Sequence, residues 1–238
     1  MKKAIVIGAT SGIGKELAKM FSQNDYVVGI VGRRSELFPE LQKEIPTEVF
    51  FKRIDVTKTS EAMNLLGELI KEMGGVDVIV ISSGVGFINP DLNWEQEKET
   101  IDVNISGFTA MANVAFKHFC IQGSGQIVGI SSIAAIRGGG DSPAYNASKA
   151  FVSNYLEGLR QKASKLKIPI VVTDIQPGLV NTVMAKGEGL FWVAPPEKAA
   201  KQIFRVIENK KRHAYITKRW RIIAWLLKIM PDWMYNKL

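Results

Sequence analysis

A glycine-rich turn directly after a short apolar run is the feature that most constrains the fold of this chain. Residues 4–7 are apolar, residues 8–14 read G-A-T-S-G-I-G, and a helix is predicted from Lys15 to Gln23. A strand that passes through glycines into a helix is typical of a βαβ unit. Glycines allow a tight turn and let the backbone approach a phosphate, which would lie at the helix N-terminus. The alternative is a turn that binds no ligand.

The rest of the chain repeats this alternation of apolar runs and helical stretches. With 238 residues, it is long enough for one well-buried core and short for two. Alternation of this kind predicts a parallel sheet with helices on both faces. We therefore expect an α/β fold: a doubly wound, Rossmann-type parallel sheet in three layers, α/β/α, in a single domain. Further strands are predicted at 26–31, 49–54, 76–81, 126–131 and 168–175, and further helices at 36–44, 60–73, 95–119 and 144–166.

Several polar or turn-forming residues follow the predicted strand ends. The carboxyl ends of parallel strands meet at one edge of the sheet, where ligands of such folds bind. These residues are therefore expected to surround one site. They are Gly8, Asp55, Ser82, Ser132 and Pro177.

The stretch from Ser132 to Lys149 carries the pattern with the clearest chemistry. Ser132 precedes Tyr145 by thirteen residues, and Lys149 follows Tyr145 by four, about one helical turn. A nearby ammonium favours the phenolate, which lowers the pKa of a tyrosine from about 10 toward neutrality. Such a phenol can give a proton to a developing alkoxide, or take one from an alcohol, near neutral pH. A tyrosine and a lysine at this spacing also occur by chance in many helices.

Charge and cysteine content bear on the class of protein and its location. The formal net charge is +8, but much of the excess lies late, at residues 210–212 and 218–221, so nucleic-acid binding is not expected. Cys120 is the one cysteine, which excludes an intramolecular disulfide and favours a reducing, cytoplasmic location. Two scattered histidines, His118 and His213, give no metal site. The first apolar run is too short for a signal peptide.

Taken in order, the motifs of this chain resemble those of the short-chain dehydrogenase/reductase family over roughly residues 4–210. Two positions depart from the family: Ile7 replaces a threonine, and Ile81-Ser82-Ser83-Gly84 replaces Asn-Asn-Ala-Gly. Both changes concern the scaffold around the cofactor and not the chemistry. The resemblance rests on Gly8–Gly14, Asp55-Val56, Ser82-Ser83-Gly84, Asn104, Ser132, Tyr145 with Lys149, and Pro177-Gly178.

The resemblance implies a role for each matching residue. Tyr145 would be the general acid/base, and Lys149 would lower its pKa and bond the nicotinamide ribose. Ser132, which the spacing selects over Ser131, would polarise the substrate carbonyl, and Asn104 would hold a water that connects Lys149 to solvent. The implied cofactor contacts are Gly8, Thr10, Ser11, Gly12, Ile13, Gly14, Asp55, Val56, Ser82, Ser83, Gly84, Tyr145, Lys149, Pro177, Gly178, Val180 and Thr182.

The end of the second predicted strand discriminates between NAD and NADP. An enzyme that prefers NAD needs a carboxylate there to accept hydrogen bonds from the ribose 2′-hydroxyl. This chain has Gly32-Arg33-Arg34 and no acid within reach. A guanidinium binds the 2′-phosphate that a carboxylate would repel. We therefore expect NADP(H), with Arg33 as the main contact and Arg34 as a helper; two solvated arginines are the alternative.

Residues 183–196 occupy the position of the family's variable substrate loop. The aromatic patch Leu190–Val193 follows Gly187 and Gly189, which could act as hinges. This composition suits a lid over an apolar substrate, and it equally suits a patch that packs on the core.

After the predicted Rossmann-type domain of residues 1–212, residues 213–238 form a basic, aromatic extension and not a second domain. The run 218–230 predicts a helix that Pro231 ends, and it is too short to span a bilayer, which needs about 20 residues. Residues 217–238 fit peripheral contact with an anionic membrane, a lid over the cleft, or a subunit interface.

Together these features predict an oxidoreductase that transfers a hydride between NADP(H) and a carbonyl or secondary alcohol on an apolar small molecule. Pairing through long helices, common in the family, implies a homo-dimer or homo-tetramer. The first alternative is an NADP(H)-binding regulator or redox sensor, which would not need the full set of catalytic residues. The second is a sugar-nucleotide epimerase or a methyltransferase, which would want a larger C-terminal region or no Tyr-Lys pair.

Overall fold

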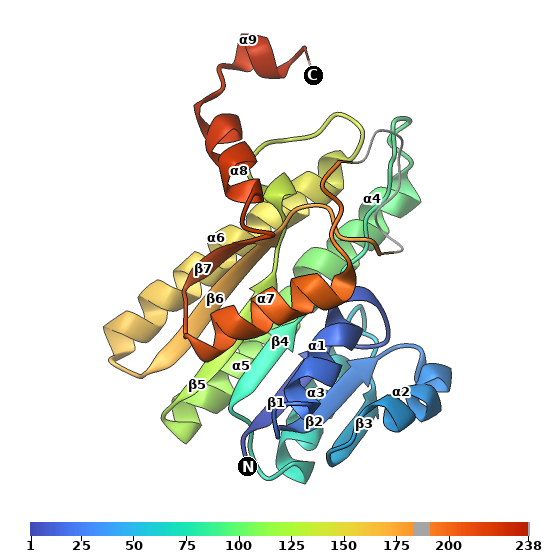
Figure 1. Cartoon of the computed structure of the whole chain (residues 1–238), viewed down its shortest axis with the longest axis vertical. Coiled ribbons are helices and arrows are strands. Elements are labelled where there is room, and N and C mark those ends of the chain that lie inside the picture. Colours follow the sequence, from blue (N-terminus) through green and yellow to red (C-terminus); the bar gives the residue numbers. More distant parts are fainter. Residues whose placement is uncertain (183–190, 238) are drawn as a thin grey trace.

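The part of the protein that the computed structural model describes, residues 1–182 and 191–237, is built on one parallel sheet of seven strands. The strands lie in the order β3-β2-β1-β4-β5-β6-β7, and each is parallel to its neighbours (Figure 1). Their bounds are β1 Lys3–Ile7, β2 Val27–Gly32, β3 Val49–Arg53, β4 Val78–Ile81, β5 Gly125–Ile130, β6 Ile170–Pro177 and β7 His213–Ile216.

Helices cover both faces of this sheet, which confirms the predicted three-layer, doubly wound fold. One face is covered by α1 Gly12–Ser22, α2 Phe38–Glu44 and α7 Pro196–Glu208. The other is covered by α3 Thr59–Glu72, α5 Phe108–Gln122 and α6 Pro143–Leu166. The remaining helices are α4 Trp94–Ile101, α8 Trp220–Ile229 and α9 Asp232–Tyr235, with single 3-10 turns at Ser35–Leu37 and Ile133–Ala135.

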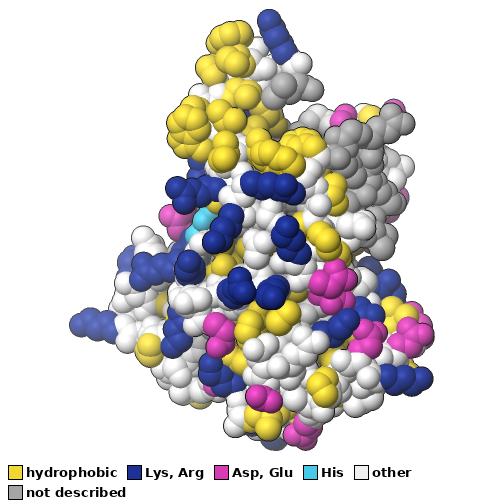
Figure 2. All heavy atoms as spheres, in the orientation of Figure 1, with side chains coloured by type: hydrophobic (Ala, Val, Ile, Leu, Met, Phe, Trp, Pro, Cys, Tyr) yellow, Lys and Arg dark blue, Asp and Glu magenta, His cyan; other side chains and the backbone are white. Residues whose placement is uncertain are grey.

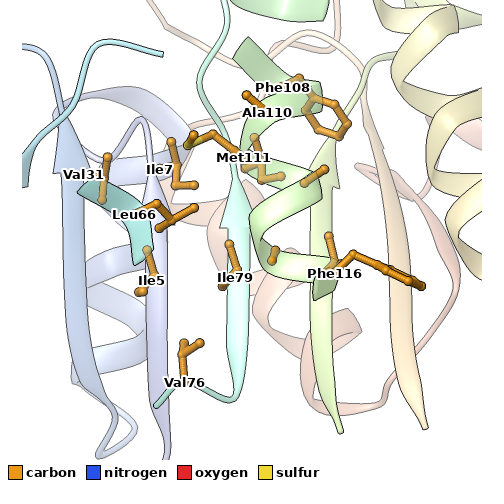
Figure 3. Packing of buried hydrophobic residues seen from close by; sticks show 14 of the residues in the cluster. Ile5, Ile7, Val31, Leu66, Val76, Ile79, Phe108, Ala110, Met111 and Phe116 are labelled. Carbon is orange, nitrogen blue, oxygen red and sulfur yellow. The ribbon is translucent and has the colours of Figure 1, made fainter. Parts of the chain in front are cut away.

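The strands alternate between two apolar layers. In β1, Ile5 and Ile7 belong to the layer under α3 and α5, whereas Ala4 and Val6 belong to the layer under α1 and α7. Figure 3 shows Ile5 and Ile7 packed near Leu66 of α3. Because both faces of the sheet are covered, the central strands are largely apolar: β4 is apolar at every position, and β1 is apolar after Lys3.

The order of the strands changes direction at β1, and this determines where a ligand can bind. The chain moves outward from β1 to β2 and β3 on one side, and then returns to add β4 to β7 on the other. The connections that leave β1 and β4 therefore diverge, and a crevice opens between them at the carboxyl ends of the strands. The helices α8 and α9 follow β7 and extend from this same edge (Figure 1).

The structure adds elements that were not predicted and divides one that was. Helix α7 and strand β7 follow the predicted substrate loop, and β7 pairs with β6, so residues 213–216 complete the sheet. The single helix predicted over 95–119 is two helices, α4 and α5, joined by a π-helical segment, Asp102–Gly107. The helix predicted over 218–230 is confirmed as α8.

Candidate active site

The glycine-rich turn between β1 and α1 packs against the backbone around it. Gly8 has a φ of +86°, and a Cβ atom added there would lie 2.6 Å from the backbone nitrogen of Ser83. A Cβ atom added at Gly14 would lie 2.2 Å from the carbonyl oxygen of Gly8. Neither position has room for a side chain without a backbone shift. The turn is thereby held so that the first N–H groups of α1 face the crevice, where they can bind an anion.

A cleft of about 830 Å³ follows the carboxyl edge of the sheet. Gly14, Asp55 and Asn104 do not line it, and Gly14 and Asn104 are buried. The other predicted site residues all line it. They are Gly8, Thr10, Ser11, Gly12, Ile13, Arg33, Arg34, Val56, Ser82, Ser83, Gly84, Ser132, Tyr145, Lys149, Pro177, Gly178, Val180 and Thr182.

The two arginines after β2 differ in how firmly they are held. Arg34 Nη2 donates hydrogen bonds to Thr10 Oγ1 at 3.0 Å and to Ser11 Oγ at 2.7 Å, which fixes its guanidinium beside the glycine-rich turn. Arg33 lines the cleft as an exposed side chain. Among the described residues, neither arginine forms an ion pair with a carboxylate. Their charges are therefore available to an anionic ligand, and Arg34 is the better positioned of the two.

Asp55 lies just beyond the end of β3 as an ionised carboxylate. Burial acts to raise its pKa, but hydrogen bonds from the Thr57 hydroxyl at 2.8 Å and the Thr57 backbone N–H at 3.1 Å outweigh this effect. The charges of Arg33 and Lys58 act in the same direction as the hydrogen bonds, so the pKa of Asp55 lies below its ordinary value. Its neighbour Val56 is the residue of this pair that lines the cleft.

The two serines after β5 have different partners. Ser131 Oγ lies 2.5 Å from Asp174 Oδ1 and 3.0 Å from the Ile175 carbonyl oxygen, and it can donate to either. Ser131, Asp174 and Ile175 are all buried. Ser132 Oγ instead accepts a hydrogen bond from Ala134 N at 3.1 Å at the start of a 3-10 turn. Its own proton is not used in that bond and is available to the cleft. Ser131 is therefore structural, and Ser132 lies with Tyr145.

Lys149 and Tyr145 lie one turn apart on α6, and burial affects both. Lys149 Nζ donates to the Ile130 carbonyl oxygen at 3.1 Å and lies 5.7 Å from the centre of the Tyr145 ring. Burial lowers the pKa of Lys149 to about 8, and the charge of Asp174 opposes this shift. Burial also raises the pKa of Tyr145, against the lowering effect of the Ser132 hydroxyl. The expected fall in the tyrosine pKa is thus wrong for this structure, because desolvation of the phenolate outweighs the favourable neighbours.

Asn104 lies in the π-helical segment, behind the cleft. Its Oδ1 accepts from Val85 N at 2.9 Å, and its Nδ2 donates to the Val85 carbonyl at 2.8 Å and to Ser148 Oγ at 3.0 Å. A Cβ atom added at Gly84 would lie 3.3 Å from both Asn104 Oδ1 and Lys149 Nζ. Asn104 therefore fastens the loop after β4 to α6, directly beside Lys149. Single-turn π-helical segments often lie at functional sites.

Several further residues that were not predicted line the cleft near Ser132 and Tyr145. They are Phe87 and Ile88 after β4, Ile133 and Ala134 after Ser132, and Ser142 and Asn146. Ser142 Oγ donates to the Phe87 carbonyl at 2.8 Å, which joins two of these segments. Only nearness in sequence to Ser82–Gly84, Ser132 and Tyr145 could have pointed to them.

The aromatic patch of the predicted substrate loop packs on α8. Residues 183–190, including Gly187, Gly189 and Leu190, lie outside the described residues. Phe191 stacks on Trp220 with ring centres 5.3 Å apart, and Trp192 meets the same ring at 6.2 Å. Thr182 at the start of the loop contacts the other half of the site, because a Cβ atom added at Gly12 would lie 3.1 Å from its Cγ2.

Comparison with protein families and relatives agrees with this geometry. Residues 2–190 match the family model described as short chain dehydrogenase. An uncharacterized oxidoreductase of Staphylococcus epidermidis is 31% identical over 188 residues, which cover 78% of this chain and 81% of that protein. An uncharacterized oxidoreductase of Mycobacterium tuberculosis is 27% identical over 241 residues, which cover 97% of this chain and 94% of that protein.

Among solved structures with the same fold, some contain NADP and others contain NAD. ElxO with NADP bound is similar with a TM-score of 0.80 at 24% identity, covering 90% of this chain and 96% of that one. A serine dehydrogenase complexed with NADP+ gives 0.78 at 27% identity, covering 86% and 88%. A short chain dehydrogenase from Mycobacterium paratuberculosis bound to NAD gives 0.81 at 19% identity, covering 91% and 96%. Since the family model covers most of the sequence, the chain belongs to the short-chain dehydrogenase family of oxidoreductases.

Proposed function

We propose that the protein is an NADP(H)-dependent carbonyl reductase or alcohol dehydrogenase that acts on an apolar substrate. One observation carries this proposal. A glycine-rich turn, a fixed guanidinium at Arg34, and the side chains of Ser132, Tyr145 and Lys149 line the same cleft. Binding of the cofactor alone would not need the serine and the tyrosine hydroxyl beside the lysine, which are the groups that proton transfer to a carbonyl oxygen requires.

The residues of the cleft fit a dinucleotide with a 2′-phosphate. The turn at Gly8 and Gly14 leaves no room for side chains, which lets a pyrophosphate approach the N-terminus of α1. Ser83 Oγ is buried and has no hydrogen-bond partner among the described residues, so a ligand group could satisfy it. Arg33 and Arg34 favour a phosphate at the ribose. The NADP-bound serine dehydrogenase, at 27% identity, is compatible with this choice, although an NAD-bound neighbour shares the fold, so the choice rests on the two arginines.

The chemistry assigned to the chain follows from the charge that develops on the substrate oxygen. The bound cofactor would supply a hydride to the carbonyl carbon. Ser132 would donate a hydrogen bond to the carbonyl oxygen, and Tyr145 would donate its proton to the same oxygen as negative charge develops there. The raised pKa of Tyr145 keeps the phenol protonated before the reaction. The Lys149 ammonium would then stabilise the phenolate that remains, and oxidation of an alcohol would reverse these steps.

The substrate class follows from the part of the cleft near Ser132 and Tyr145. Phe87, Ile88, Ile133 and Ala134 contribute apolar surface there, with the Asn146 amide nearby. This composition favours a carbonyl or secondary alcohol on an apolar frame. The cytoplasmic location and the homo-dimeric or homo-tetrameric state stay predictions, and membrane contact is argued separately below.

Replacement of Tyr145 by phenylalanine tests the proposed reaction. We expect kcat with a panel of apolar ketones and aldehydes to fall about 10³-fold, because the general acid is lost. The Kd for NADPH, measured by its fluorescence, should change little. Tyr155→Phe is the matched control, because it removes a phenol hydroxyl from the same helix outside the cleft.

Two outcomes would contradict the proposal. One is a Tyr145→Phe variant that keeps activity within a factor of a few of the unmodified protein. The other is an unmodified protein that binds NADPH tightly but reduces no carbonyl and oxidises no alcohol of the panel. The second result would favour the regulator or redox sensor that keeps the fold without the reaction.

A further inference from the structure

The C-terminal helices expose an apolar surface on one side. In α8 the exposed residues Ile222, Trp225, Leu226 and Ile229 repeat at helical spacing, so they share one face. Trp225 is 61% exposed, and Trp233 of α9 is 67% exposed. We call this surface the apolar cap: Ile222, Trp225, Leu226, Ile229, Trp233 and Met234.

The opposite face of α8 is packed on the body of the protein. Trp220 and Ala224 are buried, and Trp220 stacks with Phe191. The helix therefore has apolar residues on two sides, and only one side is covered by the described part of this chain. A helix that served only to close the protein would be polar on its outer face.

Polar contacts hold α9 in place on the loop between Ser132 and Tyr145. Arg137 Nη2 pairs with Asp232 Oδ1 at 2.6 Å, and its guanidinium lies 4.5 Å from the centre of the Tyr235 ring. Tyr235 Oη donates to the Gly138 carbonyl at 2.5 Å. The apolar cap is thus a fixed surface and not the side of a loose tail.

Positive charge surrounds the apolar cap. Residues 217–238 contain five cations, Lys218, Arg219, Arg221, Lys228 and Lys237, and a single acid, Asp232, which is paired with Arg137. Figure 2 shows the hydrophobic side chains gathered at the end of the molecule that α8 and α9 form, with Lys and Arg side chains across the face below them. Large exposed apolar patches mark interaction sites, and this charge selects an anionic partner.

An anionic bilayer surface matches this combination better than a protein partner does. Tryptophan prefers the boundary between headgroups and acyl chains, and cations beside it attract anionic lipids. The 10 residues of α8 extend about 15 Å, and no helix of residues 1–182 and 191–237 is long and apolar enough to cross a membrane. We propose that the apolar cap docks on membranes that contain anionic lipids, with α8 lying in the plane of the interface.

Docking of this kind would bear on the substrate. Helix α8 follows β7 at the carboxyl edge of the sheet, the edge along which the cleft lies. The bilayer would therefore lie at the edge of the sheet along which the cleft runs, and the substrate would be a carbonyl or alcohol dissolved in the membrane. This step rests on the proposed function, whereas the docking itself does not.

Flotation with lipid vesicles tests the docking. The full-length protein should float with vesicles of phosphatidylglycerol and phosphatidylcholine in equal parts, and much less with phosphatidylcholine alone. A double variant, Trp225→Glu with Ile229→Glu, should lose binding by about tenfold or more, because two exposed anchors become acids. A second double variant, Lys218→Gln with Arg221→Gln, should lose about tenfold or more on the anionic vesicles.

Matched controls come from the opposite edge of the sheet. Ile121 at the end of α5 is 88% exposed, so Ile121→Glu introduces the same change away from the apolar cap. Lys162→Gln on α6 removes an exposed charge from the same end of the molecule. Both controls should float like the unmodified protein, and NADPH binding should confirm that every variant is folded.

Several results would overturn the proposal. They are equal flotation on anionic and neutral vesicles, unchanged flotation of both double variants, and failure of the unmodified protein to float. If it does not float, and size-exclusion chromatography finds that Trp225→Glu with Ile229→Glu dissociates an oligomer, the apolar cap is an interface with a second copy of this chain. Since flotation does not depend on turnover, Tyr145→Phe should float normally, which separates this proposal from the proposed reaction.

Discussion

The two ends of the carboxyl edge are built in opposite ways. Around the β1–α1 turn, backbone packs on backbone, and Arg34 is fixed by the hydroxyls of Thr10 and Ser11. At α8 and α9, the apolar side chains that ought to be buried are exposed. The first region matches the cofactor that we propose, and the second matches the membrane surface that we propose. The two regions should therefore respond differently to substitution.

The largest effect is expected where the backbone is closest. In Gly14→Ala the new Cβ would lie 2.2 Å from the Gly8 carbonyl oxygen, so the turn must shift. We expect a loss of about 3 kcal/mol in the free energy of unfolding, measured by urea denaturation, and weaker NADPH binding. Gly67→Ala is the control, because nothing lies within 4 Å of that position on α3.

In the control, alanine should stabilise the helix by about 0.5–1 kcal/mol, because it restricts the unfolded chain. Equal stability of Gly14→Ala and the unmodified protein would show that the β1–α1 turn tolerates a side chain. The contrast between a closely packed turn and an exposed apolar surface would then be lost.

The next effect concerns selection between the cofactors. Arg34→Gln should lower kcat/KM with NADPH roughly thirtyfold, which corresponds to a loss of about 2 kcal/mol in transition-state stabilisation. The reason is that the substitution removes a positioned positive charge from beside the 2′-phosphate. Activity with NADH should hardly change. Arg33→Gln should have a smaller effect, since no hydroxyl group of residues 1–182 and 191–237 holds its guanidinium in place. A preference of the unmodified protein for NADH would contradict the assignment of NADP(H).

The pH dependence of reduction should report on Lys149. Its pKa is lowered to about 8, so its ammonium is present below that pH and is lost above it. The kcat for carbonyl reduction is therefore expected to be level below about pH 8 and to fall by up to about tenfold for each unit above it. In Lys149→Arg any remaining activity should lack this decline, because a guanidinium stays protonated. A flat profile for the unmodified protein would exclude Lys149 as the titrating group.

The smallest effect is expected where the C-terminal helices are attached. Arg137→Gln removes the ion pair with Asp232 and the contact with the Tyr235 ring. Because Asp232 is exposed and solvent screens the ion pair, the free energy that holds α9 on the protein should fall by about 1 kcal/mol or less. Limited proteolysis after Lys228 should become faster while the rest of the chain stays resistant. Unchanged proteolysis would mean that packing of Trp220 alone holds α8 and α9.

The fold was predictable where the hydrophobic pattern of a segment matches its burial in the folded protein. Apolar runs covered on both faces indicated the central strands, and the glycine-rich turn indicated the crossover at β1. The pattern did not indicate β7, because only Ile216 of its four residues is buried and the strand follows charged residues. The π-helical segment at Asp102–Gly107 was also missed, because its residue types are compatible with an ordinary helix.

The candidate site could be predicted as a set of residues but not as an electrostatic environment. Spacing selected Ser132 over Ser131, and the structure explains this through the contact of Ser131 with Asp174. Spacing could not give the degree of burial, which raises the pKa of Tyr145 and lowers that of Lys149. The sequence favoured Arg33 as the main contact and Arg34 as a helper, whereas the structure makes Arg34 the better positioned of the two, because hydroxyls from another part of the chain fix its guanidinium.

Gly178 connects the two regions. A Cβ atom added there would lie 2.1 Å from the indole of Trp220, so the first residue of α8 packs directly on the backbone that follows β6. A side chain at position 178 would therefore displace the start of α8. Because Pro177 and Gly178 also line the cleft, a substitution at this point would change the cleft lining and the position of the C-terminal helices together.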